Sequence, residues 1–275
     1  MGKIVFYIRA LFHESIMTRI ENIDARVAVD AFNKVCAIPA EEYRKGLHNI
    51  QLENLQAISP HIIVNHKDRG VRPYGHIQDK AKEELQKLDD ADILIPLDDD
   101  DWLSPEIKNF KFIDGLSGWN GAILRPADWA NLHYSPEHKL IAREDITTEE
   151  DKAVFNRGLL SNCQAFSGRL VKHLLASDDA RFLLQLHTKC RSVTQTYGFK
   201  EYITNARLAV YVRHACNITL LARIFQNEEL LKKEEVLKKE VLRHKDMYTQ
   251  DLNLNEEYSW AVKYMHKLAE LNKQL

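Results

Sequence analysis

The chain has 275 residues, of which 45% are hydrophobic, and its formal net charge is -2. This length can bury a sizeable core, as one large domain or one domain with an appendage. The near-neutral charge disfavours nucleic acid as a main partner. No apolar run reaches the roughly 20 residues that cross a bilayer, and the N-terminal residues are typical of a first strand rather than of a signal peptide. The four scattered cysteines are expected to be reduced and buried in a cytoplasmic protein.

The first third of the chain alternates between expected strands and helices. Apolar, β-rich runs predict strands over residues 3–8, 61–68 and 92–97, and helical spacing of apolar residues predicts helices over residues 21–35 and 77–88. Such alternation indicates an α/β fold with a mainly parallel sheet flanked by helices. Ligands of open α/β sheets bind outside the carboxyl ends of the strands, so those ends are the places to search for a site.

The rest of the chain gives weaker signals until its last fifty residues. We expect a strand and turn over residues 121–134, a loop over 135–160, a helix starting at Leu170, and a strand over 208–212 that ends at Arg213 and His214. Charged helical sequence follows from residue 227. We therefore divide the chain into a domain of residues 1–225 and a helical appendage of residues 226–275. The appendage either packs back on the domain or makes a partner contact, such as a homodimer.

The most informative segment is ADILIPLDDDDWLSP, residues 91–105, in which an apolar strand ends in four aspartates. Carboxylate oxygens suit Mg²⁺ or Mn²⁺, and Mg²⁺ commonly takes one or two carboxylates and completes its shell with water and phosphate. If strand geometry continued, Asp98 and Asp100 would point one way and Asp99 and Asp101 the other, so all four cannot bind one ion. A helix cap at Ser104 would explain that serine but not the aspartates.

The stretch ILIPLDDDDWLSP resembles the DxD region of GT-A glycosyltransferases, above all of bacterial family-2-type and rhamnosyltransferase-like enzymes. The resemblance covers residues 3–220 in the order of elements, with its specific core at residues 93–105. It implies a GT-A-like sheet and metal-dependent transfer of a hexosyl or deoxyhexosyl group from a nucleotide-diphosphate sugar to an acceptor hydroxyl. Two segments depart from the family pattern: YIRALFHES follows the first strand instead of a Thr-x-Asn-Arg-like run, and VNHKDRG replaces a run like Asp-Asp-Gly-Ser.

The resemblance also implies roles for individual residues. Asp98 and Asp99 would contact the nucleotide part of the donor. Asp100 would bind Mn²⁺ or Mg²⁺ at the diphosphate, with Asp101 beside it, and His214 would supply a further metal contact. A lone histidine is otherwise more often structural. The remaining donor-binding candidates are Arg9, Asp68 and Lys80, of which Lys80 also fits an exposed surface cation.

A catalytic base is expected only if the transfer inverts the sugar, and the sequence does not decide between inverting and retaining mechanisms. Asp178 and Asp179, in LLASDDARFLLQLH, are the candidates, with His187 as a weaker one. The same residues have the pattern of a helix N-terminus capped by Ser177 or Asp178, and this is the commoner interpretation.

Two other classes of function stay open at this point. Clustered aspartates also occur in metal-dependent phosphohydrolases and nucleotidyltransferases, which usually draw carboxylates from several segments. Alternatively, the charged C-terminal helices could make the chain a non-enzymatic interaction module. For a transferase, the resemblance favours a glycan acceptor, such as a surface polysaccharide or a lipid-linked glycan. A modified DNA base stays open, but the near-neutral charge supports it poorly. The scattered cysteines indicate a cytoplasmic location, and the helical appendage could bring the enzyme to a membrane face.

Overall fold

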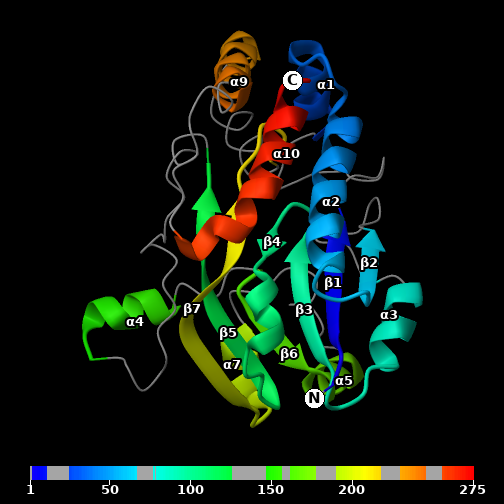
Figure 1. The fold of residues 1–275 in the computed structure, drawn as a ribbon, viewed down its shortest axis with the longest axis vertical. Coiled ribbons are helices and arrows are strands. Elements are labelled where there is room, and N and C mark those ends of the chain that lie inside the picture. The colour runs from blue at the N-terminus through cyan, green and yellow to red at the C-terminus, as the bar shows by residue number, and fades with distance from the viewer. Residues whose placement is uncertain are drawn as a thin grey trace.

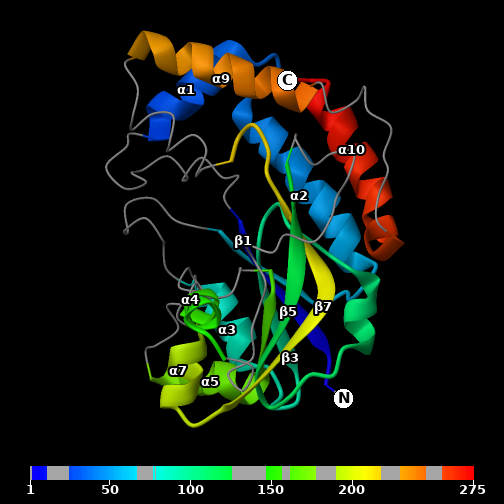
Figure 2. The same ribbon diagram turned by 90° about the vertical axis from the view of Figure 1, so that its left-hand side faces the viewer.

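The computed structural model describes residues 2–10, 25–66, 77, 79–125, 147–156, 162–177, 190–217, 230–245 and 256–275. These residues form one seven-stranded sheet with helices packed around it (Figures 1 and 2). The strands are β1 (Ile4–Ala10), β2 (Ile62–His66), β3 (Ile93–Asp98), β4 (Trp102–Leu103), β5 (Gly115–Leu124), β6 (Gln164–Ser167) and β7 (Lys200–Val212). The helices are α1 (Ala25–Val35), α2 (Ala40–Gln56), α3 (Asp79–Gln86), α4 (Glu149–Asn156), α5 (Gly168–Ala176), α7 (Cys190–Thr196), α9 (Leu230–Lys245) and α10 (Val262–Asn272), with 3₁₀ turns η2 (Pro105–Asn109) and η8 (Glu256–Ala261).

The sheet has the strand order β2-β1-β3-β6-β5-β7-β4 and contains both parallel and antiparallel pairs. β1 pairs parallel with β2 and β3, and β5 pairs parallel with β7. β6 is antiparallel to both β3 and β5, and β4 is antiparallel to β7. The expected α/β class is confirmed, and the sheet is mixed.

A short connection forces this sheet to curl. Only residues 99–101 separate β3 from β4, although β6, β5 and β7 lie between these two strands in the sheet. In a flat sheet, four strand spacings of about 4.8 Å would place β4 about 19 Å from β3. The connection spans at most about 14 Å at 3.6 Å per residue. The edge strand β4 must therefore turn back toward β3, and the aspartates bridge the two.

The three strands expected early in the chain are present as β1, β2 and β3, while several other elements differ from expectation. Neither α2 nor β6 was expected from the sequence, and α4 lies inside the expected loop over residues 135–160. β5 begins at Gly115 rather than near residue 121, and β7 begins at Lys200 rather than at 208. The cap at Ser104 is confirmed, because its hydroxyl accepts a hydrogen bond from the Glu106 N–H at 3.2 Å.

The missed helix α2 has a buried polar face. Arg44, His48, Gln51 and Asn54 are all buried, at the three- and four-residue spacing that places side chains on one side of a helix. A search for apolar residues at helical spacing overlooks such a helix. Burying so many polar groups is favourable only if they find hydrogen-bond partners, and for Arg44, Gln51 and Asn54 partners lie in residues 98–103, described below.

The C-terminal helices pack on the rest of the chain (Figure 2). α10 lies against α2, where Gly46 leaves room for the side chain of Leu271, and the Tyr43 hydroxyl donates to Asn272 Oδ1 at 2.6 Å. Leu237 and Val241 of α9 join the same apolar cluster as α10 and Phe32 of α1. Of the two expectations for the appendage, packing on the domain is therefore what the structure shows. The boundary at residue 226 and a homodimer stay predictions.

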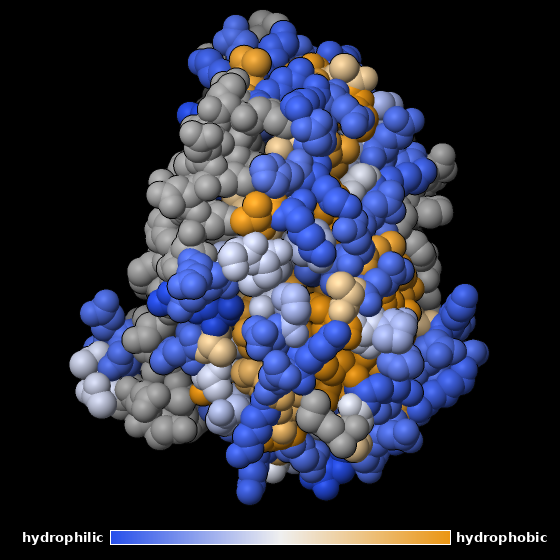
Figure 3. All heavy atoms as spheres, in the orientation of Figure 1, coloured by the Kyte–Doolittle hydropathy of each residue, from blue (hydrophilic) through white to orange (hydrophobic). Residues whose placement is uncertain are grey.

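The outer face of this region is mainly hydrophilic, with apolar atoms in small patches (Figure 3). The apolar residues of α10, among them Tyr264, Met265 and Leu268, are buried against the chain's own core. None of the described helices is both long and apolar enough to cross a membrane.

A pair of leucine substitutions tests whether the C-terminal helices belong to the core. Leu268 is fully buried, whereas Leu242 of α9 is 57% exposed. We expect Leu268→Ala to lower the free energy of unfolding by about 2–5 kcal/mol, because it leaves a cavity. Leu242→Ala, the matched control, should change it by less than about 0.5 kcal/mol. Urea denaturation followed by circular dichroism measures both, and equal effects would contradict the packing.

Candidate functional site

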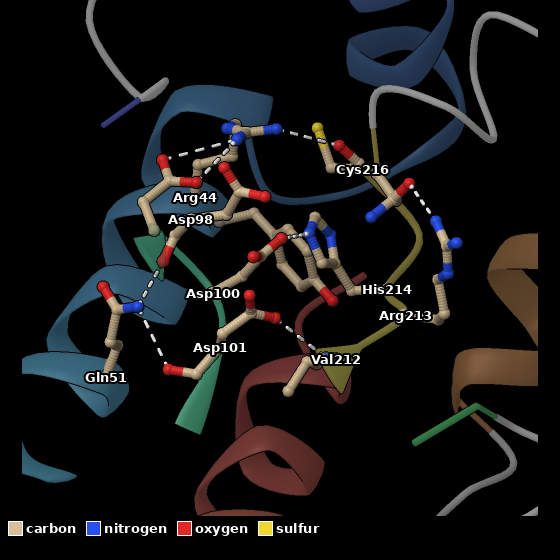
Figure 4. Close-up of polar contacts among 12 residues, drawn as sticks. Arg44, Gln51, Asp98, Asp100, Asp101, Val212, Arg213, His214 and Cys216 are labelled. Atoms are coloured by element: carbon tan, nitrogen blue, oxygen red, sulfur yellow. Dashed lines mark hydrogen bonds and ion pairs between the residues drawn. The ribbon is translucent and has the colours of Figure 1, made fainter. Parts of the chain in front are cut away.

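The four aspartates form a tight turn that leaves the carboxyl end of β3, and we call residues 98–101 the aspartate turn (Figure 4). Helix α2 holds its backbone. The Gln51 side-chain amide donates to the carbonyl oxygens of Asp98 and, at 3.0 Å, of Asp101. Asn54 donates to the Leu103 carbonyl at 2.9 Å and accepts from the Leu103 N–H at 2.8 Å. The two amides fix the path of the chain from β3 into β4.

The aspartates do not alternate as strand residues would, because β3 ends at Asp98 and a turn follows. Each carboxylate instead meets a different group. Asp98 Oδ1 lies 2.9 Å from Nη2 of Arg9, its register partner on β1. Arg9 is only 2% exposed, whereas the Asp98 side chain is 28% exposed and is the most accessible of the four. Arg9 and Asp98, two of the expected donor-binding residues, thus form an ion pair at the carboxyl end of the neighbouring strands β1 and β3.

Asp99 is paired with an arginine that the sequence analysis did not consider. Arg44 of α2 donates from Nη2 to the Asp99 carboxylate at 3.2 Å and from Nη1 to the Cys216 carbonyl at 3.0 Å. Burial alone would lower the pKa of Arg44, but Asp99 and Cys216 raise it above its usual range. Arg44 is therefore a permanent buried cation, and Asp99, 2% exposed, is occupied by it.

Asp100 meets the histidine expected to lie beside it. His214, just after β7, has its Nε2 atom 2.8 Å from Asp100 Oδ2. Burial and then the charge of Arg44 lower the pKa of His214 well below its usual value, so the imidazole is neutral near pH 7. When Asp100 is ionised, the imidazole donates its Nε2 hydrogen to the carboxylate. His214 Nδ1 is buried and has no hydrogen-bond partner among the described residues.

Asp101 is the most deeply buried of the four aspartates, with no exposed surface. Its Oδ1 accepts a long hydrogen bond, 3.4 Å, from the Val212 N–H, and within the described part of the chain its Oδ2 is buried without a partner. Burial, followed by the charges of Asp100 and Asp98, raises the pKa of Asp101 well above its usual value. Burial and Asp98 likewise raise the pKa of Asp100, to about 7.

These contacts leave a surplus of negative charge. Two of the four carboxylates, Asp98 and Asp99, are paired with arginines, while Asp100 and Asp101 face a neutral imidazole and a backbone N–H. A buried, uncompensated carboxylate either takes up a proton or binds a cation, and the raised pKa values of Asp100 and Asp101 express this tension. One divalent cation would balance the two.

The donor atoms present fit Mg²⁺ or Mn²⁺ as partial ligands. Asp98 and the 8%-exposed Asp100 offer carboxylate oxygens at the accessible side of the turn, while Asp99 and Asp101 are closed off. No set of three or more histidine, cysteine or acidic side chains in the described ranges is arranged to hold a metal. A metal here would depend on water and ligand oxygens for its remaining positions, as Mg²⁺ commonly does.

Several buried donors beside the turn were missed by the sequence analysis. Tyr7 and Arg9 of β1 lie on the same sheet face as Asp98 of β3. Gln164 of β6 shares that face, because it lies two residues before Phe166, which pairs with Leu94 of β3. Within the described part of the chain, four of these donors are buried without a partner: the Tyr7 hydroxyl, Arg9 Nε, Gln164 Nε2 and Asn162 Nδ2. Unpaired buried donors are rare, so this face suits a ligand rich in oxygen acceptors. Asn162 and Gln164 lie in the segment SNCQAFSG, residues 161–168, whose four-residue strand β6 was not expected from the sequence.

The structure does not bring every candidate into the site. Lys80 lies exposed in the first turn of α3, a helix that packs against β2 and α5. Asp68, Asp178 and Asp179 fall outside the described residues. All four cysteines are buried free thiols, as expected.

Comparisons with known proteins add no family to this picture. The chain matches no protein-family model, and a search of curated proteins gave no match. The functional interpretation therefore depends on the aspartate turn and its surroundings.

Replacing Asp100 by asparagine tests the charge surplus. Because its pKa is raised from 3.8 to about 7, the folded protein keeps Asp100 protonated at pH 5 but must bury the charge at pH 8. This group therefore costs increasing stability as the pH rises toward 7, by about 1.4 kcal/mol per pH unit, and no more above it. In metal-free protein, Asp100→Asn should raise the free energy of unfolding more at pH 8 than at pH 5. Urea denaturation at both pH values checks this, and an equal change at both would contradict the assignment.

Proposed function

We propose that this protein is a metal-dependent glycosyltransferase that moves a sugar from a nucleotide-diphosphate donor to an acceptor hydroxyl. The observation that carries the proposal is the aspartate turn at the carboxyl edge of the sheet, with two carboxylates that lack a cationic partner among the described residues and a neutral histidine beside them. The resemblance of residues 93–105 to the DxD region gives this chemistry a substrate class. The mixed α/β sheet is compatible with the GT-A-like fold that we propose with it.

In this proposal, Asp100 holds Mn²⁺ or Mg²⁺ together with Asp98, and His214 contributes through its contact with Asp100 or as a further ligand. When bound, the ion neutralises the charge that develops on the departing nucleoside diphosphate. The ion pair of Arg9 with Asp98, and the unpaired donor of Gln164 on the same side of the sheet, offer contacts to the donor. Asp99 would support the turn through Arg44 rather than touch the donor.

The finer parts of the proposal follow from the resemblance. We propose a glycan acceptor, a cytoplasmic enzyme, and Asp178 or Asp179 as the base if transfer inverts the sugar. A phosphohydrolase or nucleotidyltransferase would use the same carboxylates, but the described site draws its acidic residues from the aspartate turn alone. Enzymes that hold two metal ions usually draw their carboxylate ligands from several segments of the chain.

Donor turnover tests the proposed function. The protein is incubated with UDP-, GDP-, dTDP- and CMP-sugars, with Mn²⁺ or with EDTA, and released nucleotide is measured by chromatography. We expect Mn²⁺-dependent release of a nucleoside diphosphate from one donor, and a loss of about 100-fold or more in Asp100→Asn, since the metal contributes directly to stabilising the leaving group. Lys82→Ala, exposed on α3, is the control that should keep activity within about threefold, because surface changes are mild. Release of phosphate or pyrophosphate would instead support the phosphohydrolase or nucleotidyltransferase.

A further inference from the structure

Arg44 joins the two segments that carry the proposed metal ligands. Its Nη2 donates to Asp99, the neighbour of Asp100 in the aspartate turn, at 3.2 Å. Its Nη1 donates to the carbonyl of Cys216, two residues after His214, at 3.0 Å. Figure 4 shows the guanidinium of Arg44 with bonds to both sides. One rigid, planar group thus sets the spacing between segments that are far apart in sequence.

The pairing of β4 with β7, with Trp102 opposite Val210, also ties these segments together, but it includes neither the aspartate turn nor residues 214–216, which frame the Asp100–His214 contact on the side of α2. The remaining links are weaker or one-sided. Gln51 and Asn54 hold the backbone of residues 98–103 but make no bond to the segment after β7. Val212 reaches Asp101 through a long hydrogen bond of 3.4 Å. Arg44 is 6% exposed and therefore acts where water does not compete, so its charge-assisted bonds are strong.

We propose that Arg44 is a positioning residue that keeps His214 against Asp100 by tying the aspartate turn to residues 214–216. It touches neither a metal nor a donor in this proposal. Its importance for catalysis rests on the proposed function, whereas its effect on the geometry of the Asp100–His214 pair does not. The side chain must be arginine, because the ammonium of a lysine cannot present the same flat fork to two acceptors at once.

The test uses metal-free protein and reads the histidine directly. Two-dimensional ¹H–¹⁵N NMR of the imidazole at pH 8, assigned with His214→Gln, reports whether His214 holds one tautomer. We expect the wild type to hold the Nε2–H form, and Arg44→Gln and Arg44→Lys to show averaged nitrogen shifts. Arg191→Gln is the matched control, because Arg191 is equally buried and pairs with Glu201 at 2.8 Å, but takes no part in the aspartate turn. It should leave His214 unchanged.

A folded Arg44→Gln protein with a fixed His214 tautomer would overturn the proposal, as would an equal change in Arg191→Gln. If Arg44→Gln does not fold, Asp99→Asn gives the same comparison, since it weakens the bond and leaves Arg44 in place. A second measurement, Mn²⁺ titration by electron paramagnetic resonance, should show affinity about 10–100-fold weaker in Arg44→Lys, as for other residues that orient metal ligands. If the wild type binds no Mn²⁺, the proposed function fails while the NMR result still decides the role of Arg44.

Discussion

The structure depends on how a concentrated negative charge is confined in a very short connection. Residues 99–101 must bridge two strands that are not neighbours, and they carry three carboxylates with Asp98 directly before them. Mutual repulsion would open such a turn if nothing opposed it. Two buried arginines and two amides of α2 do oppose it, and what they leave uncompensated defines the chemistry of the site. The same four side chains that strain the turn therefore also form the site on which the proposed function depends.

The apolar core is arranged around this turn in two clusters. One cluster contains residues of β1, β3, α3 and α5. The other contains residues of α1, the first part of α2, α9 and α10, which lie at the opposite end of the molecule in Figure 1. Trp102, directly after the aspartates, packs against Tyr264 of α10 with the ring centres 5.8 Å apart. Helix α10 thus packs against the residue that directly follows the aspartate turn, through an aromatic pair. A helical segment that looked separable in the sequence is part of what holds the aspartates in place.

The parts of this picture that the sequence predicts are those encoded locally. β1 and β3 are short apolar runs, and β3 ends clearly at the acidic turn. The Ser104 cap is evident from the run Ser104-Pro105-Glu106. Helix α2 was missed because its buried face carries Arg44, Gln51 and Asn54, whose partners lie about fifty residues or more further along the chain. β6 has only four residues, too few for a periodic signal. The run of four aspartates is evident in the sequence itself, whereas the resemblance to a family is what makes Asp100 and His214 candidates for one site.

The distance along the chain between these partners has a consequence for protein synthesis. Asp100 and His214 are 114 residues apart, and Arg44 and Cys216 are 172 residues apart. Contacts of such separation form late, because long loops must close first. While the ribosome is still adding residues beyond 200, β1 and β3 can already pair, yet their acidic end lacks His214 and also lacks β7, with which β4 pairs. The aspartate turn is therefore among the last parts of the described fold to meet its partners during synthesis, and its carboxylates stay open to solvent until then.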